Sequence, residues 1–180
     1  MPTVDIVLFP AHASPATPLG FEGIVQNVLK TDGMILFSYE DHMKLAQDPS
    51  YPGMISPLTL AMSGPTDVQH VDFDEDGTKA LDAPATEIVL LTLKPDTALA
   101  DLHSRLKNLK DTVEKVPTCH AVAVGESRDK NGTWFILMGW DSIQAHKDVA
   151  AKPEFQEIGK SLFAIADVNP VHIKLVEHTG

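Results

Sequence analysis

Strand-like and helix-like hydrophobic patterns alternate along the second half of the chain. Residues 87–94 (EIVLLTLK) form an apolar run that is too short for a helix and ends before a proline, which indicates a buried strand. Leucines and one valine then recur every three or four residues from Leu99 to Val113, the spacing of an amphipathic helix. The runs CHAVAVGES and TWFILMGW flank RDKNG, whose Asn131-Gly132 pair supplies the positive φ angles of a hairpin turn.

A second helix and a closing strand complete this half. Either Asp141 or Ser142 can cap a helix that carries His146 and continues past an interruption at Pro153. The run PVHIKLVEH then predicts a last strand. The resulting order is β-α-β-β-α-β, a ferredoxin-like motif.

The first half repeats this order with one strand missing. VDIVLF predicts an opening strand, apolar positions in residues 21–29 follow helical spacing, and MILFSY (34–39) predicts the next strand. A helix with His42 follows, and DVQHVDF ends the copy. The polar run DEDGTKALDAPAT reads as a linker. We therefore expect a shortened first repeat at 1–74, a linker at 75–86 and a full repeat at 87–180.

One short spacing supports a tandem duplication. A His is followed seven residues later by Pro and two residues after that by an aromatic residue, at His42, Pro49 and Tyr51 and again at His146, Pro153 and Phe155. Each ferredoxin-like unit leaves one sheet face bare, so two units can bury these faces against each other. The strand TWFILMGW is apolar on both faces, as a strand covered on both sides requires. We expect an α+β fold in which two repeats form a barrel.

This layout resembles the dimeric α+β barrel superfamily, and within it the antibiotic biosynthesis monooxygenase-like and stress-responsive barrel groups. The residues that carry the resemblance are WDS (140–142) before the helix with His146, the following KPEF, and YEDH and DPSYP in the first copy. The superfamily includes cofactor-free oxygenases, polyketide cyclases, haem-handling enzymes and proteins with no known reaction.

The resemblance also implies particular site residues. In the cofactor-free monooxygenases, Trp and Asn residues surround an aromatic substrate; Trp134 and Trp140 are present here, and the Asn near them is turn residue Asn131. In the cyclases a catalytic His belongs to a His-Pro motif, where this chain has DPSY and KPEF. Tyr51 can donate a proton at that place, whereas Phe155 cannot.

Histidines are the main candidates for chemistry, because their side chains titrate near neutral pH. His42 and His146 are candidate general bases, the alternative being that each packs over the sheet edge as part of the scaffold. If the face with Val171 and Ile173 meets the helices, His172 points into the barrel as a further catalytic candidate; otherwise it lies on a solvent-facing strand. Candidates for substrate binding, besides the two tryptophans, are His12, Tyr39, His70 and His120.

Composition and charge limit the classes of partner that the protein can bind. The net charge is −11 and the 14 basic residues are scattered, which argues against nucleic acid. No apolar run approaches the roughly 18 residues of a membrane span. A single cysteine fits a reducing compartment, and the start of the chain does not read as a signal peptide, so we expect a cytoplasmic protein.

Metal and cofactor sites are not expected from spacing, because no H-E-x-x-H or C-x-x-C motif occurs. The leading hypothesis is a cofactor-independent monooxygenase, cyclase or isomerase acting on a small aromatic or polyketide-like molecule through a His base. The alternative is a non-catalytic ligand-binding or stress-response barrel. Because the first repeat lacks one strand, we expect its open edge to be buried in a homodimer.

Overall fold

The computed structural model describes residues 3–8, 43–44, 46–53, 56 and 67–173. By contacts the chain divides into two units, of which one contains residues 71–175 and the other residues 3–70. In the second of these, β1 (Thr3–Leu8) lies where VDIVLF predicted a strand, and residues 51–53 are helical. Strand β2 (Asp67–Phe73) matches the predicted DVQHVDF and continues into the unit that begins at Val71. The predicted elements between residues 9 and 42 lie outside the described residues.

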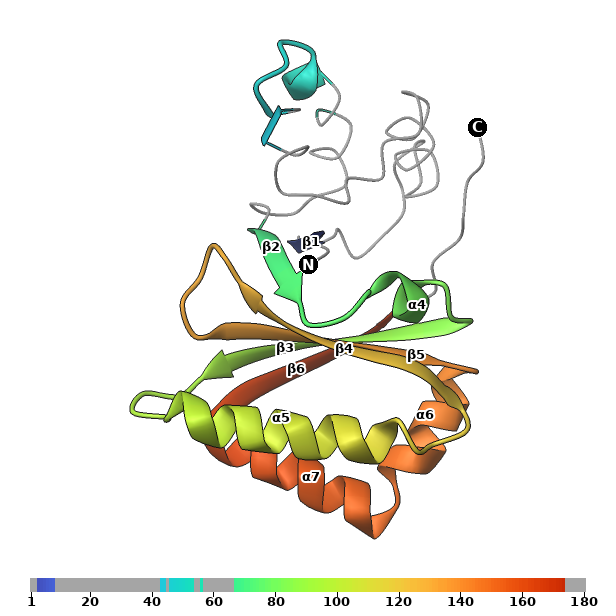
Figure 1. Ribbon diagram of the computed structural model, residues 1–180. Helices are drawn as coiled ribbons and strands as arrows, with labels where there is room; N and C mark the ends of the chain where they lie inside the picture. The colour runs from blue at the N-terminus through green and yellow to red at the C-terminus, as the bar shows by residue number, and fades with distance from the viewer. Residues whose placement is uncertain (1–2, 9–42, 45, 54–55, 57–66, 174–180) are drawn as a thin grey trace, which may run out of the picture. The chain divides into compact units, whose positions relative to one another are not determined.

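The unit from residue 71 has the predicted ferredoxin-like order (Figure 1). After the short helix α4 (Thr78–Leu81), its elements are β3 (Ala85–Leu93), α5 (Leu99–Val113), β4 (Cys119–Ser127), β5 (Thr133–Trp140), α6 (Ile143–Ala150), α7 (Pro153–Ile165) and β6 (Ala166–Ile173). The sheet is antiparallel at every pairing described, in the order β2-β4-β5-β3-β6. Helices α5, α6 and α7 cover one face and α4 lies on the other.

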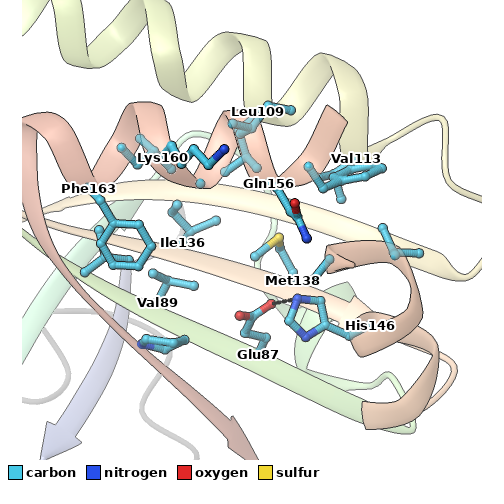
Figure 2. A pocket seen from close by; sticks show the side chains of 18 of the residues that line it. Glu87, Val89, Leu109, Val113, Ile136, Met138, His146, Gln156, Lys160 and Phe163 are labelled. Carbon is cyan, nitrogen blue, oxygen red and sulfur yellow. Dashed lines mark ion pairs between the residues drawn. The ribbon is translucent and has the colours of Figure 1, made fainter. Parts of the chain in front are cut away.

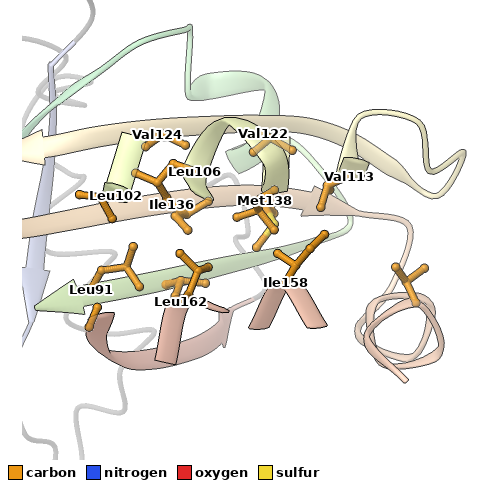
Figure 3. Packing of buried hydrophobic residues seen from close by; sticks show 14 of the residues in the cluster. Leu91, Leu102, Leu106, Val113, Val122, Val124, Ile136, Met138, Ile158 and Leu162 are labelled. Atoms are coloured by element: carbon orange, nitrogen blue, oxygen red, sulfur yellow. The ribbon is translucent and has the colours of Figure 1, made fainter. Parts of the chain in front are cut away.

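The core fills the space between the sheet and the three long helices (Figure 3). Leu102, Leu106 and Leu109 of α5 are buried at the spacing the sequence predicted. Opposite them, Ile136 and Met138 come from alternate positions of β5. Burial of such side chains contributes roughly 1.5–3 kcal/mol each, so this layer fixes the helices against the sheet.

Both faces of β5 are buried, as the apolar pattern of TWFILMGW indicated. Ile136 and Trp140, on the helix side, are each 1% exposed, while Phe135 and Leu137 on the opposite side are 0% exposed. On that opposite side α4 lies directly against Gly139, where an added Cβ would come within 2.8 Å of the Ala83 Cβ. The predicted linker at 75–86 therefore includes a helix that packs on the sheet.

The β4–β5 hairpin has the predicted connection but differs from its prediction in one backbone angle. The connection spans the five residues from Arg128 to Gly132, the run RDKNG. Within it Gly132 has a positive φ (74°), whereas Asn131 does not. The Ser127 hydroxyl accepts the backbone N–H groups of Asp129 and Lys130, both at 3.1 Å, and these hydrogen bonds hold the loop. Among the described residues, no helix is both long and apolar enough to cross a membrane.

Candidate functional site

A pocket lies between the sheet and helices α5, α6 and α7 (Figure 2). Its volume is about 450 Å³, within the range of small-molecule sites. Helix α6 ends before Pro153 begins α7, so two separate helices cover this end of the sheet. Ala150 and Gly159 face the pocket with little or no side chain, and this leaves room there.

Apolar side chains form most of the pocket wall. Val89, Ile136 and Met138 line it from the sheet, and Val113 from α5. Phe163 of α7 also lines it and is 55% exposed, which indicates that this side of the pocket reaches solvent. The polar side chains of the lining are Glu87, His146, Gln156 and Lys160. An apolar pocket with few polar groups is typical of a site for a small organic molecule.

Glu87 occupies a position that the strand period assigns to the core. Its neighbours at alternate positions of β3, Ala85 and Val89, are buried in the helix-side cluster, and Glu87 itself is 4% exposed. Burial raises the pKa of Glu87 to about 7, while the nearby Trp140 N–H acts in the opposite direction. The Trp140 indole N–H lies close to the carboxyl group. However, neither Trp140 Nε1 nor Glu87 Oε2 makes an aligned hydrogen bond.

His146 lies above Glu87 on α6. The helix begins where predicted, because the Ser142 hydroxyl accepts the Ala145 N–H at 3.0 Å as an N-cap. The His146 Nε2 atom is 3.1 Å from Glu87 Oε2, and its Nδ1 atom is 2.7 Å from His172 Nε2. The Trp140 and His146 rings lie 4.9 Å apart. His146 is thereby held between a carboxyl group, an indole and a second imidazole.

Burial keeps both imidazoles neutral at pH 7. It lowers the pKa of His146 to about 4, and protonation of His172 and the charge of Lys147 act in the same direction. Burial, followed by the charge of Lys147, also lowers the pKa of His172. The 3.1 Å distance between His146 and Glu87 would suit an ion pair, but burial favours the neutral form of both groups. The contact is therefore better described as a contact between two neutral polar groups than as an ion pair.

His172 reaches this cluster by a face of β6 different from the one expected. The expectation that His172 points into a barrel required Val171 to meet the helices, but Val171 is 52% exposed. Val168 and Pro170, which share the alternate positions with His172, line the pocket instead. Glu87 and His172 are register partners on β3 and β6, so their side chains leave the sheet side by side. The condition for His172 to point into a barrel is therefore not met; His172 lies on the helix side of the sheet, against His146.

The other sequence candidates are dispersed. Trp140 lines the pocket, whereas Trp134 is half-buried and stacks edge-on against His103 at 5.3 Å. His120 is exposed at the rim, 2.7 Å from Asp141. The buried His70 of β2 and the half-buried Tyr51 are not among the residues that line the pocket. His12, Tyr39 and His42 lie outside the described residues.

Sequence reasoning missed Glu87. The available signal was the alternation of Glu87 with Val89 and Leu91, which places a carboxyl group on the apolar face of a buried strand. Its partners were not visible, because His146 and His172 are 59 and 85 residues away along the chain. The three residues each offer one ligand atom within 4.8 Å of the others, so this is the group of described residues that could hold a metal ion.

Comparisons with known proteins agree with this fold. Residues 84–161 match the family described as antibiotic biosynthesis monooxygenase. A candidate monooxygenase from Fusobacterium nucleatum subsp. nucleatum has a similar structure, with a TM-score of 0.69, 11% identity, and coverage of 98% of this chain and 93% of that one. SnoaB, a cofactor-independent oxygenase from Streptomyces nogalater, matches with a TM-score of 0.48 and 17% identity over 52% of this chain and 94% of its own.

Another solved structure, a candidate antibiotic biosynthesis monooxygenase from Bordetella bronchiseptica, is 20% identical with a TM-score of 0.47 and covers 52% of this chain and 97% of its own. No curated protein matches the chain. The fold similarity extends over nearly the whole chain in the Fusobacterium protein, and the family match falls on the half that contains the pocket. Residues 84–161, less than half of the chain, are similar to the antibiotic biosynthesis monooxygenase family.

Proposed function

We propose that the protein is a cofactor-independent enzyme that binds a small aromatic or polyketide-like molecule in the pocket and takes a proton from it with His146. The observation that carries this proposal is a neutral imidazole fixed at one end of an apolar cavity of about 450 Å³. The cavity is lined mostly by apolar side chains, which suits an apolar molecule, and His146 is a basic group of its lining.

The geometry favours Nε2 of His146 as the basic atom. When His146 Nδ1 carries the proton and donates it to His172 Nε2, the lone pair on His146 Nε2 is left for a substrate. Nε2 approaches Glu87 Oε2 without an aligned hydrogen bond, so a substrate O–H or C–H can replace that contact at little cost. Glu87 and His172 act as positioning residues that hold the ring.

Proton removal leaves an electron pair delocalised over the substrate. A phenol, or a C–H group beside a carbonyl, gives an anion that can rearrange, as in an isomerase or cyclase, or reduce O₂. In an oxygenase a CH₂ group would become a carbonyl group and the second oxygen atom would leave as water, with all four electrons drawn from the substrate. The apolar wall keeps bulk water away from the anion.

His146→Ala tests this proposal. Turnover of polycyclic phenols and 1,3-diketones is followed by oxygen consumption and absorption, and binding by quenching of the Trp140 fluorescence in a Trp134→Phe background. General base catalysis contributes about 100-fold or more, so we expect turnover to fall by at least about 100-fold with binding retained. His103→Ala, which alters an exposed histidine on α5, is the control and should leave turnover unchanged.

Full turnover in the His146→Ala variant would contradict the proposed role of this residue. Binding of the same compounds without any turnover by the wild-type chain would support the non-catalytic barrel instead.

A further inference from the structure

Glu87 of β3 and His146 of α6 line the pocket, and His172 of β6 joins them through its contact with His146. We propose that these three side chains bind one divalent transition-metal ion of the zinc class, and that the bound ion blocks the base. The sequence alone does not indicate this site, because no two of the three residues are close along the chain.

The donor set matches the chemistry of such ions. Two imidazole nitrogens and one carboxylate oxygen are the three protein ligands of many open zinc sites, and imidazole suits zinc, cobalt and iron(II). Ligand atoms around a tetrahedral zinc ion lie about 3.4 Å apart, given bonds of about 2.0–2.1 Å. Here one atom from each residue lies within 4.8 Å of the others, so modest side-chain rotations complete the set.

A second observation points to a cation at this place. The Glu87 Oε2 atom is buried and has no aligned hydrogen bond. A buried polar atom without a partner costs about 1–3 kcal/mol, and a cation would supply the missing partner. The 2.7 Å contact between the two imidazoles also holds them together only through a shared proton, which a metal ion can replace. The pocket beside His146 leaves space for a further ligand on the ion.

The surface of the same domain offers a matched comparison. His120 and Asp141 also place an imidazole and a carboxylate 2.7 Å apart, but both side chains are about half exposed. Among the described residues, no third His, Cys, Asp or Glu joins this pair to make a group that could hold a metal ion. The pair should therefore bind metal only weakly. His120→Ala is therefore the control for binding at any exposed histidine.

The experiment titrates Co²⁺, followed by its visible absorption, and Zn²⁺, followed by calorimetry, into chelator-treated full-length protein. We expect one ion per chain. Glu87→Gln, His146→Ala and His172→Ala should each weaken binding at least tenfold, and His120→Ala should leave it unchanged. Glu87→Gln keeps the side-chain shape, so it remains informative if an alanine variant does not fold, and circular dichroism checks the fold of each.

Two results would overturn the metal site: no stoichiometric ion on the wild-type chain, or unchanged affinity in a folded His146→Ala/His172→Ala double variant. The blocking effect rests on the proposed function and is measured separately. Zn²⁺ should abolish turnover and a chelator should restore it. If chelation instead abolishes turnover, the blocking effect and cofactor independence both fail while the metal site stands.

Discussion

At Glu87 a carboxyl group stands among core side chains, and this position has a cost in stability. Val89 and Met138 line the same cavity, and the carboxyl group receives no aligned hydrogen bond at Oε2. Burying a polar group without a hydrogen bond costs free energy, about 1–3 kcal/mol in proteins, so an apolar group of similar volume is expected to be more stable here. Residues kept in spite of such a cost are typical of functional sites.

We expect Glu87→Leu to raise the free energy of unfolding by about 1 kcal/mol, because it removes a desolvated carboxyl group and fills apolar space. Urea denaturation at pH 7 measures the change. Glu154→Leu, at an exposed position of α7, is the control and should give no gain. A loss of stability on Glu87→Leu would mean that the contact with His146 stabilises the fold by more than its burial costs.

Cys119 gives a second prediction at this scale. Burial raises the pKa of its thiol from 9.0 to about 11, with the charge of Glu114 acting in the same direction. At pH 8 the thiolate is then about 100-fold rarer than for a thiol of ordinary pKa, and only the thiolate reacts. We expect iodoacetamide to modify the folded protein about 100-fold more slowly than the same protein in guanidinium chloride. Equal rates in the two states would contradict the burial of this thiol.

At the scale of elements, two glycines differ in the space around them. Gly139 of β5 touches α4, and an added Cβ would meet the Ala83 Cβ at 2.8 Å and the Ala80 Cα at 2.9 Å. Gly159 lies inside α7, where an added Cβ would meet nothing within 4 Å. The first glycine permits a close approach of helix and sheet, while the second leaves room at the pocket and weakens its helix.

We therefore expect Gly139→Ala to lower the free energy of unfolding by about 1–3 kcal/mol, as overpacking does. Gly159→Ala should raise it by up to about 1 kcal/mol, because alanine is the better helix former. Thermal unfolding of both variants gives the comparison within one domain. A neutral Gly139→Ala variant would show that α4 can move away from β5 without loss.

The elements of the second half could be predicted because each has a strong hydrophobic period. The leucine spacing of α5, the two apolar faces of β5 and the cap at Ser142 all appear in the structure as expected. The arrangement of the site residues could not be predicted in the same way. Which face of β6 meets the helices depends on its register with β3, and this register is a property of the sheet that no single strand carries.

At the scale of the whole molecule, the charge of −11 opposes association. Among the described strands β6 pairs only with β3, and an edge of this kind is commonly covered by a partner. We expect a homodimer whose stability increases with salt, because screening weakens the repulsion between two acidic chains.

Light scattering at about 0.02 M and about 0.3 M salt measures this, since screening lengths differ severalfold between these conditions. The dimer fraction should be higher in the second condition. A mass of one chain at both salt concentrations would exclude the dimer.

The register between β3 and β6 also constrains how this gene can change. Eight consecutive residue pairs join the two strands, with Glu87 opposite His172. Because side chains alternate between faces, a codon inserted or deleted between positions 166 and 171 would turn His172 away and bring Val171 to the helix side. Substitutions along β6 change the cluster by degrees, whereas a single insertion removes it at once. In descendants that keep the cluster, gaps should therefore fall outside these strands and gather in the connecting loops.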